Sequence, residues 1–119
     1  MLEKRRSPRF AMEAVVLWKP ESRYGMEGPM NISHTRDLST GGLSAMLQEG
    51  VRPGDTLQLE LKLPGGQSVY SRVRVTWVSN HERLKSWEIS VCEGGVEFLN
   101  LSDSDIFAID QFISEIYGI

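Results

Sequence analysis

The chain has 119 residues, of which 40% are hydrophobic and 24% are charged, and these values fit a single globular domain with its own core. The formal net charge of −3 argues against a protein that binds nucleic acid over a broad basic face. Because residues 1–10 carry an excess of positive charge while the rest of the chain is acidic, we expect one small anionic ligand or a short electrostatic contact.

Residues 1–10 form a basic segment with no helical or strand periodicity. Its basic residues are Lys4, Arg5, Arg6 and Arg9, against the single acid Glu3. Pro8 fixes its own φ and biases Ser7 toward extended geometry, so we predict an extended basic arm. Pro8 also interrupts any signal-peptide core, and Cys92 is the only cysteine. We therefore expect a cytoplasmic protein without membrane insertion.

Six segments after the arm have the composition or alternation of β-strands. They are residues 11–19, 29–38, 43–47, 57–63, 69–77 and 86–99. The alternation from Val69 to Trp77 places Trp77 with the core residues, and a position near a ligand is the alternative. Gly94-Gly95 suggests a bulge or break in the last strand.

The end of the chain has a helical pattern. Ser102 and Asp105 resemble a capping box, and Gly118 provides a stop signal. Apolar residues recur at helical spacing between them: Ile106, Ile109, Ile113 and Ile116, with Phe107, Phe112 and Tyr117 beside them. The helix carries four acids and no Lys or Arg, which indicates a solvated face or a docking surface for a basic partner.

These elements predict a mainly β fold in one domain, residues 1–119. A six-stranded antiparallel β-barrel spans residues 11–99, the arm precedes it, and a C-terminal α-helix spans residues 102–117.

Two short motifs have complementary chemistry. Arg5 and Arg9 are separated by up to about 13 Å of extended chain, so their guanidinium groups could bracket a phosphate or pair with guanine O6 and N7. Asp37 could accept hydrogen bonds from a guanine edge, Ser39 could donate or accept, and Gly42 would let a ring approach the backbone.

The pattern Arg5-x-x-x-Arg9 followed by Asp37-x-Ser39-x-x-Gly42 resembles the two-part signature of PilZ domains, which are bacterial receptors for cyclic di-GMP. The stretch Gly95-Val96-Glu97-Phe98-Leu99 and the closing helix also look like that family's ending. The resemblance implies a split six-stranded barrel with a flanking helix. It also implies that Arg5 and Arg9 hold phosphates and guanine edges, while Asp37, Ser39 and Gly42 contact the second face of the nucleotide.

A second set of candidates surrounds these motifs: Lys4, Arg6, Gly41 and Trp77. Some family members carry a further arginine where Lys4 stands and bind an intercalated nucleotide dimer, so one or two nucleotides remain open here. The resemblance implies cyclic di-GMP as the ligand, no cofactor, and an effector protein in motility, biofilm or exopolysaccharide control. Arm closure over the nucleotide would change the binding of that effector.

Two other functions remain open. One is a PilZ-like adaptor that works through protein contacts without nucleotide. The other is a single-stranded nucleic-acid binder with Trp18, Trp77 or Trp87 as stacking platforms, against which the overall acidity argues. His34 and His81 lack a neighbouring Cys or acid at metal-ligand spacing, and no catalytic motif is present. We therefore predict a binding protein without a metal and not an enzyme.

Overall fold

The fold is a β-barrel with one helix across its end. The computed structural model describes residues 9–21, 30–48, 50–79 and 91–118. Within these ranges the elements are β1 (Phe10–Ala11), β2 (Val15–Pro20), β3 (Asn31–Leu38), β4 (Gly42–Gln48), β5 (Thr56–Lys62), β6 (Ser68–Val78), β7 (Val91–Phe98) and α1 (Asp103–Tyr117).

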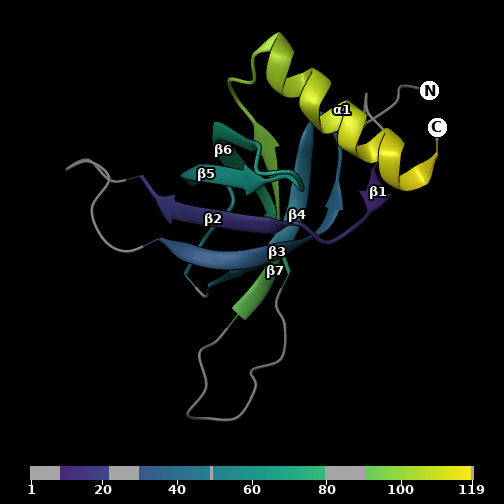
Figure 1. Ribbon diagram of the computed structural model, residues 1–119. Helices are drawn as coiled ribbons and strands as arrows, with labels where there is room; N and C mark the ends of the chain where they lie inside the picture. The colour runs from purple at the N-terminus through teal and green to yellow at the C-terminus, as the bar shows by residue number, and fades with distance from the viewer. Residues whose placement is uncertain (1–8, 22–29, 49, 80–90, 119) are drawn as a thin grey trace, which may run out of the picture.

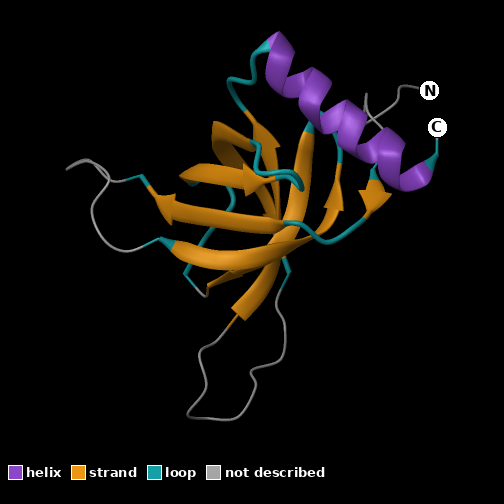
Figure 2. Ribbon diagram, viewed as in Figure 1, coloured by secondary structure: helices purple, strands orange, loops and turns teal. Residues whose placement is uncertain are grey.

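The barrel is closed by antiparallel pairing in the order β3-β2-β5-β6-β7-β4, with β4 returning to β3 (Figures 1 and 2). Six strands form the barrel, as the sequence predicts. The additional strand β1 pairs with the end of β3, where Phe10 lies opposite Leu38 and Ala11 opposite Asp37. This short pairing brings the residue just before β1, Arg9, to the end of β3.

The first predicted strand, residues 11–19, is divided into β1 and β2. The buried side chain of Thr35 explains the division, because its hydroxyl donates to the Met12 carbonyl at 2.7 Å and accepts from the Ala14 amide at 2.9 Å. The Thr35 side chain therefore forms hydrogen bonds with a carbonyl and an amide that would pair with the neighbouring backbone in a continuous strand.

The barrel interior is filled by the alternating apolar residues of the long hairpin β5–β6. Leu57, Leu61, Val69 and Val73 are each 0% exposed, which confirms the predicted alternation. Trp18 of β2 is also in this core and only 2% exposed. It cannot serve as a surface stacking platform in this fold.

α1 begins and ends where the sequence signals predict. The Ser102 hydroxyl accepts from the Asp105 amide at 3.1 Å, and the Asp105 carboxylate accepts from the Ser102 amide at 3.2 Å. Gly118 ends the helix in the left-handed conformation, with φ of 70°. No helix in the described part of the chain is both long and apolar enough to cross a membrane.

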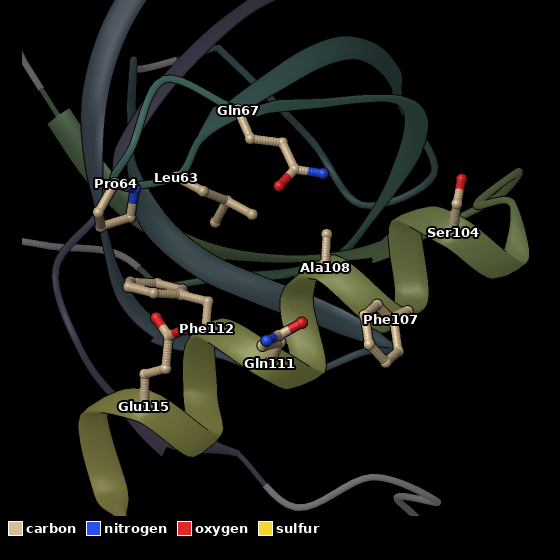
Figure 3. A pocket seen from close by; sticks show the side chains of 9 residues that line it. All are labelled: Leu63, Pro64, Gln67, Ser104, Phe107, Ala108, Gln111, Phe112 and Glu115. Atoms are coloured by element: carbon tan, nitrogen blue, oxygen red, sulfur yellow. The ribbon is translucent and has the colours of Figure 1, made fainter.

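α1 covers one end of the barrel with only part of its apolar surface (Figure 1). Its buried residues are Ala108, Ile109, Phe112 and Ile113. Ile106, Phe107 and Ile116, which the helical pattern also groups with the apolar face, are exposed. A groove separates the exposed side of α1 from the β5–β6 turn (Figure 3).

We predict that Ser102→Ala lowers the free energy of unfolding by about 1 kcal/mol, because it removes the hydroxyl that caps α1. Urea unfolding measures this. Asp105→Asn is the control, since its amide oxygen still accepts from the Ser102 amide and should cost less. Equal stability of Ser102→Ala and the wild type would contradict the capping role.

Candidate functional site

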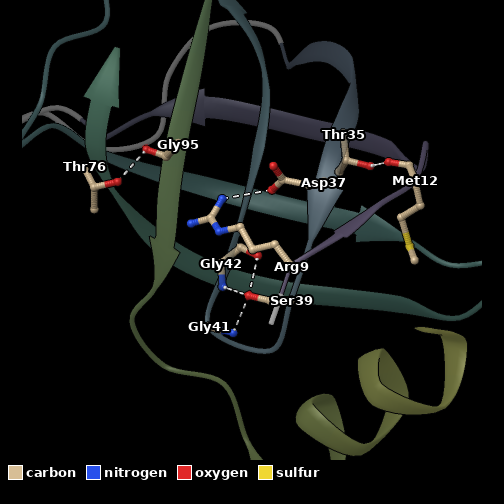
Figure 4. A network of polar contacts seen from close by, with 9 residues as sticks. All are labelled: Arg9, Met12, Thr35, Asp37, Ser39, Gly41, Gly42, Thr76 and Gly95. Carbon is tan, nitrogen blue, oxygen red and sulfur yellow. Dashed lines mark hydrogen bonds and ion pairs between the residues drawn. The ribbon is translucent and has the colours of Figure 1, made fainter. Parts of the chain in front are cut away.

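The connection between β3 and β4 is a tight turn organised by Ser39. Its hydroxyl accepts from the amides of Gly41 and Gly42 at 3.1 and 3.2 Å, and its amide donates to the Gly42 carbonyl at 2.9 Å (Figure 4). Ser39 is 3% exposed, so the turn itself uses this hydroxyl. A contact between Ser39 and a ligand stays a prediction.

Gly42 of β4 lies close to the backbone of β7. A Cβ atom on Gly42 would lie 2.1 Å from the Val96 carbonyl oxygen, a distance that side chains do not tolerate. The sequence interpretation assigned the absent side chain to a ligand ring. The described structure shows a structural role for Gly42, which is to let two strands of the barrel meet, and a contact between Gly42 and a ligand stays a prediction.

A bulge in β3 turns Asp37 away from the barrel interior. Thr35 pairs with Ala45 and Asp37 pairs with Ser44, so Arg36 is an extra residue on β3. Thr35 is buried on the interior side, and regular alternation would put Asp37 on that side too. The extra residue shifts the alternation, so that Leu38 fills the interior and Asp37 faces outward.

An ion pair between Arg9 and Asp37 joins the two sequence motifs (Figure 4). Arg9 Nη1 lies 2.9 Å from Asp37 Oδ1, and the side chains are 17% and 31% exposed. The strand pairing of β1 with β3 accounts for this meeting. The other candidates on the arm, Lys4, Arg5 and Arg6, lie outside the described residues, and their roles stay predictions.

A second bulge turns Trp77 outward. Val75 pairs with Val96 and Trp77 with Gly95, so Thr76 is an extra residue on β6, and its hydroxyl donates to the Gly95 carbonyl at 3.1 Å. The predicted bulge near Gly94-Gly95 is confirmed, although the extra residue belongs to the partner strand. The interpretation of Trp77 as a core residue is wrong, because regular alternation does not continue through the bulge.

The Trp77 indole lies directly over Gly95. A Cβ atom on Gly95 would lie 2.0 Å from Trp77 Nε1, so only glycine leaves room for the ring. Since Gly95 faces outward between Trp77 and Ser44, the indole occupies the outer surface of β7.

Strand register places four residues in one row across the outer surface: Asp37 on β3, Ser44 on β4, Gly95 on β7 and Trp77 on β6. Ser44 is 0% exposed, and its hydroxyl has no hydrogen-bond partner among the described residues. Sequence reasoning missed this residue. The alternation after the turn could have identified it. Leu43 and Ala45 face the core, so Ser44 lies on the opposite face together with Gly42.

The row and Arg9 together can recognise a planar polar ring. A carboxylate accepts N–H donors, a guanidinium binds phosphate or carbonyl oxygens, and an indole stacks on a base. No cluster of three or more metal-ligating side chains occurs within the described residues.

Two nearby arginines on the barrel exterior are engaged elsewhere. Arg72 Nε and Nη2 lie 2.7 and 3.0 Å from the two Glu21 carboxylate oxygens, and Arg74 Nε lies 2.9 Å from Glu97. The hydrogen bonds from Arg72 hold the pKa of the Glu21 carboxyl below its usual range. These side chains are therefore paired on the barrel surface.

Comparison with known families matches residues 3–115 to the PilZ domain. A comparison with curated proteins found no match. Among solved structures, the inhibitor of motility MotI/DgrA from Bacillus subtilis is similar with a TM-score of 0.73 at 17% identity, over 98% of this chain and 53% of that one.

Two further structures are similar, and both contain c-di-GMP. The PilZ domain of YcgR from Escherichia coli has a TM-score of 0.63 at 16% identity, over 98% of each chain. MrkH from K. pneumonia has a TM-score of 0.70 at 17% identity, over 98% of this chain and 52% of that one. This chain thus spans about half the length of MotI/DgrA and MrkH, and these likenesses establish the fold.

We predict that Gly42→Ala lowers the free energy of unfolding by about 1–3 kcal/mol or more, because the new methyl group would overlap the Val96 carbonyl. Urea unfolding measures the change. An unchanged midpoint would contradict the close approach of β4 and β7. Because this variant is expected to disturb the fold, weaker ligand binding by Gly42→Ala would not by itself show that Gly42 contacts the ligand.

Proposed function

The chain belongs to the PilZ domain family, and from this premise we propose that it is a receptor for cyclic di-GMP. The observation that carries the proposal is the Arg9–Asp37 ion pair, which joins the second arginine of one motif to the first residue of the other. Similarity to YcgR and MrkH, whose structures contain c-di-GMP, supports it.

We propose that the nucleotide binds over the outward row of Asp37, Ser44 and Trp77. Asp37 accepts from the N1–H and amino group of one guanine, and Arg9 binds a phosphate or the O6 and N7 edge. The Trp77 indole stacks on a base. Ser39 and Gly42 hold the turn that presents Asp37, and Gly41 lies in the same turn.

The arm completes the site in this proposal. Arg5 binds the second phosphate, and Lys4 and Arg6 raise the local positive potential. Charge-assisted contacts to the phosphates must exceed the entropy lost when the arm is fixed. Closure of the arm then changes the surface offered to an effector protein in motility, biofilm or exopolysaccharide control.

Titration calorimetry with cyclic di-GMP tests the proposal. We expect saturable binding by the wild type and at least about tenfold weaker binding by Arg9→Ala and by Asp37→Ala, since each loses a charge-assisted hydrogen bond. Arg52→Ala, at an exposed arginine in the turn before β5, is the matched control and should bind as the wild type does.

Thermal unfolding of each variant separates binding from folding, because both Arg9 and Asp37 lie outside the core cluster. Absence of any heat or thermal stabilisation with folded wild-type protein would reject the receptor proposal and favour the nucleotide-independent adaptor.

Ser44→Ala tests the unpartnered hydroxyl in the row. We expect unfolding stability equal to or above that of the wild type, because a buried hydroxyl without a partner costs about 1–3 kcal/mol. We also expect about three- to tenfold weaker nucleotide binding, because in this proposal the incoming base displaces the side chains that bury the Ser44 hydroxyl and supplies its missing partner. Calorimetry and urea unfolding measure the two effects, and unchanged affinity would remove Ser44 from the site.

A further inference from the structure

A groove of about 410 Å³ lies between α1 and the turn that joins β5 to β6 (Figure 3). One wall contains Leu63, Pro64 and Gln67 from the turn, and the other contains side chains of α1. None of the residues lining the groove belongs to the proposed nucleotide site.

The groove has an apolar floor and an exposed aromatic rim. Leu63, Ala108 and Phe112 form the floor and are 6–8% exposed, because they also belong to the barrel core. Phe107 stands at the rim with 67% of its surface exposed. An exposed aromatic residue beside an apolar groove is typical of a protein interaction site, where such residues are enriched.

Two side-chain amides line the groove from its opposite walls. Gln67 comes from the turn and Gln111 from α1, and neither amide has a hydrogen-bond partner among the described residues (Figure 3). Each amide offers two donors and an acceptor, so the pair can bind the backbone groups of a peptide segment.

The negative charge on α1 indicates which kind of segment would bind in the groove. The helix carries Asp103, Asp105, Asp110 and Glu115 and no Lys or Arg. Asp103, Phe107 and Asp110 follow i, i+4 and i+7 spacing, so the two carboxylates flank the phenyl ring on one face. Glu115 itself lines the groove. A cationic segment complements this surface, whereas the acidic helix of a second copy would bring like charges together.

We propose that this groove docks a segment of a partner protein in which a large apolar side chain is flanked by Lys or Arg. The apolar side chain packs on Phe107 and over the floor. The cationic side chains pair with Glu115 and with the carboxylates beside Phe107, and Gln67 and Gln111 bind the segment's backbone. This docking does not depend on the nucleotide.

Selection of random 12-residue peptides displayed on phage against the immobilised full chain, without nucleotide, tests the proposal. We expect the enriched peptides to share a large apolar residue next to Lys or Arg. A synthetic copy should bind Phe107→Ser at least about tenfold more weakly, because this variant loses the aromatic ring on which the peptide's apolar side chain packs. Ile32→Ser, which removes a 72% exposed apolar residue of β3, is the control and should bind normally.

Charge is tested at one position with two variants. Glu115→Lys should weaken peptide binding more than Glu115→Gln, because repulsion adds to the lost attraction. Enrichment of acidic peptides, no enrichment, or equal affinity for wild type and Phe107→Ser would overturn the proposal. Self-association lost in Phe107→Ser would also overturn it, since the occupant would then be a second copy. Calorimetry with cyclic di-GMP tests the receptor proposal independently of these peptide experiments, so either proposal can be rejected without the other.

Discussion

The two-residue period of β-strands is the constraint on which the candidate site depends. A closed barrel assigns every second residue of each strand to a filled interior, so a side chain reaches the exterior only if its strand has the right phase. Two bulges change that phase, one at Arg36 in β3 and one at Thr76 in β6. Without them, Asp37 and Trp77 would both point into the core.

Glycine allows the strands between the bulges to lie close together. Gly42 admits the Val96 carbonyl, and Gly95 admits the Trp77 indole. Thr76 adds a hydrogen bond to the Gly95 carbonyl, which ties the β6 bulge to β7. The shape of the outer surface thus depends on these glycines as much as on the polar groups around them. The strands hold those polar groups in place.

Much of the fold could be predicted from the sequence because local signals decide it. The alternation of Leu57 to Leu61 defines the long hairpin, and Ser102 with Asp105 defines the helix start. The position of Trp77 could not be predicted, because it depends on pairing with a strand that follows it in the chain. The same holds for β1 and β2, which Thr35 separates from 21 residues away. Sequence spacing predicted both motifs, but their meeting through Arg9 and Asp37 required the pairing of β1 with β3.

In the proposed site, a ligand would have to replace the Arg9–Asp37 ion pair with its own contacts to both side chains. A simple anion that took Arg9 would leave the partly buried Asp37 carboxylate without its cation, and that loss would offset much of the gain. A ligand that presents acceptors to Arg9 and N–H donors to Asp37 at the same time replaces both halves of the pair. In the proposed receptor, selectivity against abundant cellular anions such as inorganic phosphate would thus arise from the Arg9–Asp37 ion pair itself.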